Sequence, residues 1–322
     1  MSTVISCVFS GSEADRAVAG LLGESERVAR EFTARHCVIA VDVTDDLLDC
    51  AARHADSVIA IESSEGGYQI ESTLSALHSI CAEFTPRVVL LGQDTYSQEL
   101  APRLAHRLQG CSIGDAQRVA VDDGKIHVTR SVYGGKAVAT IRANVEPAVV
   151  WLRSRAFAAE AERKTPGPID RRPRTPDDGL RSTKIVQRQR EAGSGVRLED
   201  ARVIVSGGRG LGGPEPFENL RGLAKAMNAE LGASRAACDA GWVPPGLQVG
   251  QTGKKVSPDL YLAIAISGAS QHLMGIADAK VVAAINTDPD APIFGQCSFG
   301  LVEDWKNVVD PLRDQLAKLV SD

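Results

Sequence analysis

Short apolar runs alternate with longer amphipathic segments in the first half of the chain, and this alternation restricts the possible folds more than any other feature. The runs are continuously apolar, as in RVVLLG at residues 87–92, which is typical of strands buried on both faces. When helices separate such strands, the result is a parallel, doubly wound sheet. We therefore expect strands at Val4–Phe9, Cys37–Val41, Ser57–Ile61, Val88–Gly92 and Ala148–Leu152, with helices at Arg16–Arg35, Gln69–Glu83 and Gln98–Leu108.

A second α/β unit is expected in the last third of the chain. Its predicted strands are Arg202–Ser206, Leu260–Ile266 and Val281–Asn286, and its predicted helices are Asn219–Leu231, Gln271–Ala277 and Leu301–Leu319.

In the first unit, Lys125–Arg130 and Lys136–Arg142 flank the turn SVYGG and predict an antiparallel pair. The fold class is therefore α/β with two domains, an N-terminal doubly wound, mostly parallel sheet and a C-terminal Rossmann-like domain.

The segment Arg163–Arg190 differs in composition from both units. It holds four prolines, nine Lys or Arg and three Asp, and proline at this density disfavours helices and central strands. We interpret it as a linker at about 163–190 that ends an N-terminal domain at 1–185, before a C-terminal domain at 191–322. A solvated tether is the simpler interpretation, and a strap that docks on a partner is the alternative.

The composition of the chain limits the classes of function that it could have. A length of 322 residues favours two domains, and the net charge of −5 argues against nucleic-acid binding. The sequence has no apolar run of 18 residues and no basic leader followed by an apolar stretch, so we expect no membrane insertion and a cytoplasmic protein. The seven cysteines are scattered without CxxC spacing, which favours reduced thiols and no metal site.

A glycine-rich loop, SGGRGLGG at residues 206–213, joins a predicted strand to a predicted helix. Gly208 and Gly210 would let backbone N–H groups approach an anion closely. Arg209 between them could bind a pyrophosphate through its guanidinium fork. The loop matches neither GxGxxG nor the P-loop pattern, so taken alone it is also consistent with a tight structural turn.

Three further segments carry small and polar residues, and the first of them directly follows a predicted strand. The first, after Leu260–Ile266, is Ser267, Gly268, Ala269, Ser270, Gln271 and His272; the second is Gln248, Val249, Gly250, Gln251 and Thr252; the third is Ser234 and Arg235. Two small-residue turns at strand ends of one domain indicate a nucleotide crevice. His272 would lie near a helix N-terminus, which lowers the pKa of an imidazole. Arg235, in a segment that reads as buried, needs an anionic ligand or Asp239 as its partner.

In order and spacing, these segments resemble the FAD-binding domain of electron-transfer flavoprotein alpha subunits. The resemblance runs from residue 201 to the C-terminus through VIVSGGRGL, LGASRAACDAGWVP, QVGQTGKKVSPDLYLAIAISGASQH and INTDPDAPIF. VVLLGQDTYSQELAPRLAHRL and SVYGGKAVATIR resemble the N-terminal domain of that family more loosely. Few of the first 80 residues match.

The resemblance implies one FAD and a beta subunit as partner in a heterodimer. It implies an electron carrier rather than an enzyme with its own small-molecule substrate, taking electrons from a flavin-dependent dehydrogenase to a membrane quinone oxidoreductase or another acceptor. By motif position, Arg209 and its neighbouring glycines would contact the FAD phosphates. Arg235, Thr252 and His272 would tune the flavin, with Ser234 and Gln251 beside its ring system. Ser267 and Gln271 would bind the pyrophosphate and ribityl side, and Asn286 and Asp304 the adenosine end.

Departures from the family pattern leave alternatives open. Cys297-Ser298-Phe299 replaces an Ala-Asp-Tyr-like triplet, and Ser270 stands where an aliphatic residue is common. A specialised or flavin-poor member and a subunit of an electron-bifurcating flavoprotein both remain possible. A nicotinamide dehydrogenase would need an acid/base group beside its cofactor, and the sequence offers no such constellation.

Overall fold

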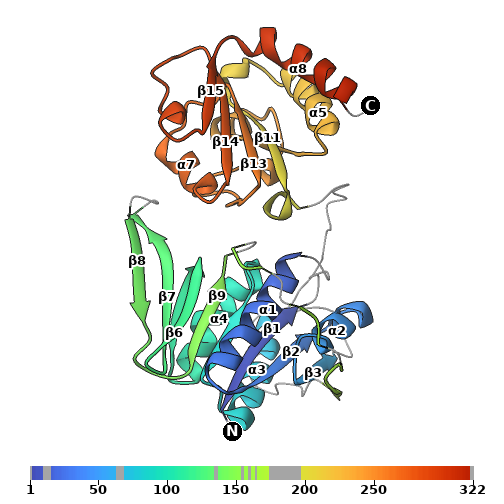
Figure 1. Ribbon diagram of the computed structural model, residues 1–322, viewed down its shortest axis with the longest axis vertical. Coiled ribbons are helices and arrows are strands. Elements are labelled where there is room, and N and C mark those ends of the chain that lie inside the picture. Colours follow the sequence, from blue (N-terminus) through green and yellow to red (C-terminus); the bar gives the residue numbers. More distant parts are fainter. Residues whose placement is uncertain are drawn as a thin grey trace. The chain divides into compact units, whose positions relative to one another are not determined.

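The computed structural model contains two compact units (Figure 1). The first comprises Met1–Val132 and Ala137–Glu191, and the second comprises Tyr133–Lys136 and Ala192–Asp322. The structure describes residues 2–9, 16–62, 69–133, 137–153, 156–158, 161–163, 165–173 and 197–319. Within these residues, no helix combines the length and the hydrophobicity needed to cross a bilayer.

A seven-stranded parallel sheet forms the centre of the first unit, in the strand order β10-β3-β2-β1-β4-β9-β5. Its strands are β1 (Thr3–Phe9), β2 (Arg35–Val41), β3 (Ser57–Glu62), β4 (Val88–Leu91), β5 (Cys111–Ala116), β9 (Ala148–Leu152) and β10 (Ile169–Pro173). Its helices are α1 (Arg16–Glu31), α2 (Asp45–Ala52), α3 (Ile70–Phe84) and α4 (Thr95–Arg107).

Helices cover both faces of this sheet (Figure 1), as the continuous apolar strands predict. Successive residues of β1 point to opposite faces. Val4 and Val8 pack in the layer that holds α1 and α2, whereas Ile5 and Cys7 pack in the layer that holds α3 and α4. The predicted parallel sheet is confirmed. The expectation omitted α2 and β5, because α2 has only eight residues and β5 is the weakly apolar CSIGDA.

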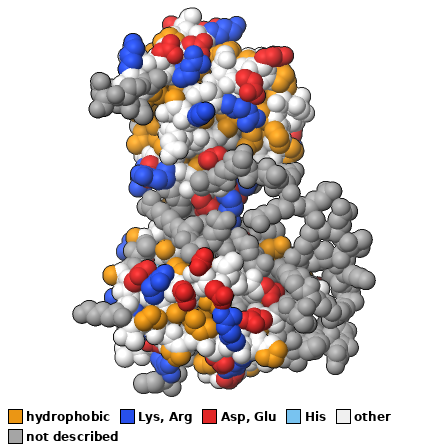
Figure 2. Space-filling model, turned by 90° about the vertical axis from the view of Figure 1, so that its right-hand side faces the viewer, with side chains coloured by type: hydrophobic (Ala, Val, Ile, Leu, Met, Phe, Trp, Pro, Cys, Tyr) orange, Lys and Arg blue, Asp and Glu red, His pale blue; other side chains and the backbone are white. Residues whose placement is uncertain are grey.

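A smaller antiparallel sheet consists of β6 (Arg118–Asp122), β7 (Lys125–Val132) and β8 (Ala137–Arg142). The pair β7 and β8 confirms the antiparallel pairing predicted around SVYGG. On the face of the molecule seen in Figure 2, acidic and basic side chains of the described residues are interspersed over both units.

The structure corrects one part of the linker prediction. Ile169–Pro173 forms β10, an edge strand that pairs with β3, and Arg163 forms ion pairs with Asp56 and Glu26 of the first unit. Proline is tolerated on an edge strand, where no neighbour needs its missing N–H on the open side. The segment 165–173 is therefore part of the first sheet and not a tether. Residues 174–196, which hold the rest of the predicted linker, lie outside the described residues.

The second unit contains a five-stranded parallel sheet in the order β12-β11-β13-β14-β15. Its strands are β11 (Val203–Gly207), β12 (Glu230–Ala233), β13 (Leu260–Ile264), β14 (Val281–Asn286) and β15 (Phe299–Val302), and its helices are α5 (Pro216–Ala226), α6 (Arg235–Asp239), α7 (Ser270–Ile276) and α8 (Trp305–Leu319). Helices α5 and α8 pack on one face of the sheet (Figure 1). Leu273 and Ile276 of α7 belong to the core of the other face.

Two predicted helices in this unit were too long. The helix predicted at Asn219–Leu231 ends at Ala226, and Leu231 lies in β12. Asn228 adopts φ 48°, a left-handed conformation that stops a helix. The helix predicted from Leu301 starts at Trp305, because Phe299–Val302 pairs with β14 as an edge strand.

Candidate functional site

The strand order of the second unit creates a crevice at the carboxyl ends of its strands. The chain passes from β11 outward to β12 and then returns to β13 on the other side of β11. The loops that follow β11 and β13 therefore leave the sheet in opposite directions. Open parallel sheets bind their ligands at such a switch point.

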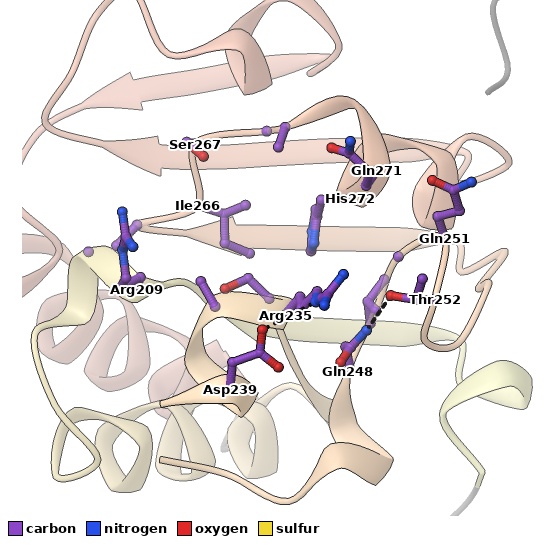
Figure 3. Close-up of a pocket in the computed structure, with 18 of the residues that line it drawn as sticks. Arg209, Arg235, Asp239, Gln248, Gln251, Thr252, Ile266, Ser267, Gln271 and His272 are labelled. Carbon is purple, nitrogen blue, oxygen red and sulfur yellow. Dashed lines mark hydrogen bonds and ion pairs between the residues drawn. The ribbon is translucent and has the colours of Figure 1, made fainter. Parts of the chain in front are cut away.

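A cavity of about 600 Å³ lies at this point, and most of the predicted site residues line it. Figure 3 shows Arg209 and Ser267 toward one end, Gln248, Gln251 and Thr252 toward the other, and Arg235 and His272 between them. The lining residues are Arg209, Gly210, Ser234, Arg235, Ala236, Asp239, Gln248, Val249, Gly250, Gln251, Thr252, Ala265, Ile266, Ser267, Gly268, Ala269, Gln271, His272, Asn286 and Asp288.

Three predicted residues, Gly208, Ser270 and Asp304, are not part of this lining. Gly208 contacts the end of β13 instead: its N–H donates to the carbonyl of Ile264, the last residue of that strand, at 2.9 Å. A Cβ at this position would lie 2.0 Å from the Ala265 carbonyl oxygen. This glycine therefore allows the loops after β11 and β13 to approach each other, and Arg209 and Gly210 then reach the cavity.

Arg235 differs from its sequence interpretation. We expected a buried cation, but its side chain is 66% exposed. It lies in the first turn of α6, and its Nε is 3.2 Å from Oδ2 of Asp239 one turn later. The segment misled because its buried residues, Ala237 and Cys238, face the core while the arginine faces the cavity. The guanidinium is therefore available to a ligand.

Ser234 directly precedes the first residue of α6, and its hydroxyl is a possible contact for a ligand in the cavity. The Oγ atom is buried, and within the described residues it has no hydrogen-bond partner. A buried hydroxyl without a partner costs about 1–3 kcal/mol. Since Ser234 lines the cavity, a polar ligand atom there would remove this cost.

The segment Gln248–Thr252 forms the opposite end of the cavity. The Gln248 side-chain amide donates to the Thr252 hydroxyl at 3.0 Å, and the Gln251 N–H donates to the Gln271 carbonyl at 2.7 Å. Gly250 between them adopts φ 146°, a conformation that side chains disfavour. These bonds hold two amides and a hydroxyl on one wall.

The loop that precedes α7 brings Ser267, Ala269 and Gln271 to the cavity. It turns at Gly268, where φ is 80°. A Cβ there would lie 2.4 Å from the Ile293 backbone nitrogen, so both conformation and space require glycine. Ala265, which the sequence interpretation missed, adopts φ 54° in the same loop. Strained backbone of this kind concentrates at functional sites.

His272 lies on the cavity wall with 7% of its surface exposed. Burial lowers its pKa to about 4, and a hydrogen bond with the Val249 backbone acts in the opposite direction. Burial, rather than the helix N-terminus that we expected, is therefore the main reason for the low pKa of this imidazole. Its Nε2 lies 3.0 Å from the Tyr261 hydroxyl.

A second cavity, of about 330 Å³, adjoins the first. Asn286 lines both, and Asp304 lines only the second, so the structure separates these two predicted residues. The carboxylate of Asp304 accepts from the Lys306 N–H at 3.0 Å and caps α8. Asp288, which lines the main cavity, was missed by the sequence interpretation. INTDPD at residues 285–290 reads as a turn, and nothing in its composition singles out one carboxylate.

The main cavity offers two arginines, several neutral donors, a buried hydroxyl without a partner and backbone that approaches closely at glycines. This set fits an extended ligand with anionic groups. Within the described residues, no three His, Cys, Asp or Glu side chains gather to hold a metal ion.

Comparisons with known proteins agree with this donor set. Residues 11–177 match the model of the electron transfer flavoprotein domain, and residues 197–277 match that of the electron transfer flavoprotein FAD-binding domain. A protein of Thermoanaerobacterium thermosaccharolyticum described as electron transfer flavoprotein subunit alpha is 35% identical over 305 residues, which is 93% of this chain and 92% of that relative. The protein of Bacillus subtilis with the same description is 37% identical over 269 residues, 82% of each. Protein FixB of Clostridium saccharobutylicum is 32% identical over 307 residues, 94% of this chain and 92% of that relative.

Proposed function

This chain belongs to the electron-transfer flavoprotein family as an alpha subunit, an electron carrier with FAD as its cofactor, and we propose that its FAD lies in the main cavity of the second unit. The observation that carries the proposal is the convergence of four loops on one cavity. The loops follow β11, β12, β13 and β14, and they bring Arg209, Arg235 and the partnerless Ser234 hydroxyl to it.

The charged end of the cofactor is assigned to Arg209. FAD carries a pyrophosphate, and an arginine fork binds such oxygens with two charge-assisted hydrogen bonds. Arg209 follows β11 and lines the same end of the cavity as Ser267 (Figure 3). Ser267 and the backbone at Gly210 complete this end. Gln271 lies nearer the other end, where its carbonyl accepts from the Gln251 N–H, and is assigned to the ribityl side. Asn286, shared between the two cavities, and Asp304 in the smaller one are assigned to the adenosine end.

The flavin ring is assigned to the wall that holds Arg235, Thr252 and His272. The bound FAD supplies the one-electron chemistry, and the chain supplies orientation and electrostatics. Arg235 places a permanent positive charge at the ring, where reduction adds negative charge. The Gln248 amide supports the Thr252 hydroxyl, and the neutral His272 adds a polar group that does not change its charge near pH 7. None of these steps needs a side chain that removes a proton from a substrate.

The partners are assigned by the subunit description of the relatives. A chain called subunit alpha works with another subunit, and we propose a beta subunit as the partner in a heterodimer. The donor is proposed to be a flavin-dependent dehydrogenase, and the acceptor a membrane quinone oxidoreductase or another redox protein. We propose a cytoplasmic location, because the described cysteines form no disulfides and thiols stay reduced in that compartment.

The assignment of the cavity is tested with Arg209→Ala. Loss of a charge-assisted contact costs about 1.5–3 kcal/mol, so FAD should bind roughly ten- to hundredfold more weakly. The matched control is Arg221→Ala on α5, which removes an exposed arginine paired with Glu218 outside the cavity. FAD dissociation constants are measured by flavin fluorescence on the complex after FAD has been removed. Equal constants for parent and Arg209→Ala would contradict the proposal.

A further inference from the structure

A residue behind the cavity wall makes the hydrogen bond that holds His272. Tyr261 is the second residue of β13, is completely buried and does not line the cavity. Its hydroxyl is 3.0 Å from Nε2 of His272, and the ring centroids are 5.9 Å apart at an interplanar angle of 58°. The contact is therefore an edge-on hydrogen bond rather than a ring stack.

Both members of this pair are uncharged near neutral pH. Burial raises the pKa of the Tyr261 phenol above its ordinary range, and a contact with the Ser206 hydroxyl offsets part of that increase. Burial lowers the pKa of His272 to about 4. A neutral imidazole has one N–H and one bare nitrogen, and a phenol can donate or accept. Because the phenol is the more acidic donor and the imidazole nitrogen the more basic acceptor, the hydrogen bond runs from Tyr261 Oη to His272 Nε2.

Little else fixes the imidazole by hydrogen bonding. Within the described residues, Nδ1 of His272 is buried and makes no hydrogen bond of standard distance and angle, and the Val249 backbone is near enough to the ring to raise its pKa. The bond at Nε2 is therefore the hydrogen bond of standard geometry that selects which nitrogen carries the proton, and the Val249 backbone favours the same protonated Nδ1. Without the phenol, the ring could turn over and the proton could occupy either nitrogen.

We propose that Tyr261 is a positioning residue for the flavin site: its hydroxyl holds His272 as the Nδ1–H tautomer and in one ring orientation on the cavity wall. This inference rests on the proposed FAD site and deepens it. Tyr261 touches no ligand itself. It acts by holding in one position the imidazole ring that lines the cavity.

The first experiment needs no cofactor, so its outcome does not depend on whether the proposed function is correct. The full-length chain in its complex is labelled with ¹⁵N-histidine, FAD is removed, and imidazole ¹⁵N spectra are recorded near pH 7. The chain has six histidines, and the spectrum of His272→Gln identifies the signals of His272. We expect a protonated Nδ1 and a bare Nε2 in the parent. A protonated Nε2 would overturn the proposal even if Tyr261→Phe did not fold.

The second experiment uses Tyr261→Phe, which removes only the hydroxyl. We expect the His272 signals to shift toward the Nε2–H tautomer, and FAD to bind more weakly, by about two- to tenfold, because the imidazole on the cavity wall is no longer held in one orientation. Tyr96→Phe on α4 of the first unit is the matched control and should change neither quantity. In the His272→Gln background, Tyr261→Phe should no longer weaken FAD binding, because its effect passes through the imidazole. An equal loss in that background, or unchanged His272 signals in Tyr261→Phe, would overturn the proposal.

Discussion

Arg235 Nε lies 3.2 Å from Asp239 Oδ2 at the cavity, and both side chains are more than 60% exposed. A pair as exposed as this contributes about 0.3–0.5 kcal/mol to stability when it spans one helical turn. Its position at the proposed flavin ring gives it a second role, because Asp239 partly neutralises the charge that Arg235 places there.

Arg235→Ala should lower the flavin reduction potential. A fixed positive charge favours the reduced flavin over the oxidised one, and in a partly desolvated site the difference is about 1–3 kcal/mol, or roughly 40–130 mV for one electron. Arg235→Lys should keep part of this effect, since it retains the charge but loses the planar group. Spectroelectrochemical titration of the FAD-loaded variants measures it, and potentials equal to those of the parent would leave Arg235 with a structural role only.

Asp239→Asn should act in the opposite direction. Removing the carboxylate leaves Arg235 uncompensated, so the flavin potential should rise, by less than Arg235→Ala lowers it. Glu218→Gln, which removes a carboxylate from the exposed pair with Arg221 on α5, is the control and should leave the potential unchanged. A lower potential for Asp239→Asn would contradict this, because it would mean that Asp239 mainly holds the Arg235 guanidinium near the ring rather than neutralising its charge.

Gly268→Ala should destabilise the second unit. The residue has φ 80°, and an added Cβ would meet the Ile293 backbone nitrogen at 2.4 Å, so strain and a backbone clash combine to more than about 2 kcal/mol. At Gly295, a Cβ would meet nothing within 4 Å and φ is not positive. Gly295→Ala should therefore change the thermal midpoint little. Equal midpoints for the two variants would show that the loop before α7 can adapt.

Acid should destabilise both units through buried histidines. Burial lowers the pKa values of His36 in the first unit and His272 in the second to about 4, from an ordinary value near 6.5. Well above pH 6.5 neither the folded nor the unfolded state binds a proton, so the two histidines cost no stability there. As the pH falls toward 4, only the unfolded state binds protons, and each histidine costs up to about 3 kcal/mol. Denaturant unfolding between pH 7 and 4.5 measures this, and His36→Gln should flatten the slope for the first unit.

Arg153 and Asp115 form a buried bidentate pair, with nitrogen–oxygen distances of 2.8 and 2.7 Å. Arg153→Ala would leave a buried carboxylate without its cation, which costs about 3–5 kcal/mol. Arg103→Ala removes a half-exposed arginine that pairs with Glu99 and should cost less than about 1 kcal/mol. Similar losses for both variants would mean that water reaches Asp115 when Arg153 is absent.

The most accurate predictions came from sequence patterns that are typical of one kind of structure. The apolar runs of β1, β4 and β9 allowed only buried parallel strands, and their positions were predicted within one residue. β12 and β15 could not be predicted this way, because each is an edge strand of four residues. β12 is the weakly apolar ELGA, and the apolar β15, FGLV, lies directly before the last helix, to which the prediction assigned Leu301 and Val302. Their pairing depends on contacts with β11 and β14 that are distant in sequence.

The sequence predicted which loops form the site, but not how buried each side chain is or what it contacts. Glycines and polar residues after strands located the cavity correctly, whereas the exposure of Arg235 depends on which face of α6 meets the core. The role of Tyr261 was hidden for the same reason. In DLYLAIAI the tyrosine reads as one more buried strand residue, and only the packing of α7 against β13 brings its hydroxyl to His272.

Hydrogen exchange with and without FAD tests the location of the cofactor most directly. FAD is removed from the complex and added back, and amide exchange is followed by mass spectrometry. We expect slower exchange at residues 208–212, 234–239, 248–252 and 266–272, the segments that carry most of the cavity lining, with little change at residues 35–62 of the first unit. Slower exchange confined to other segments, with these four unaffected, would contradict the assignment of the main cavity to FAD.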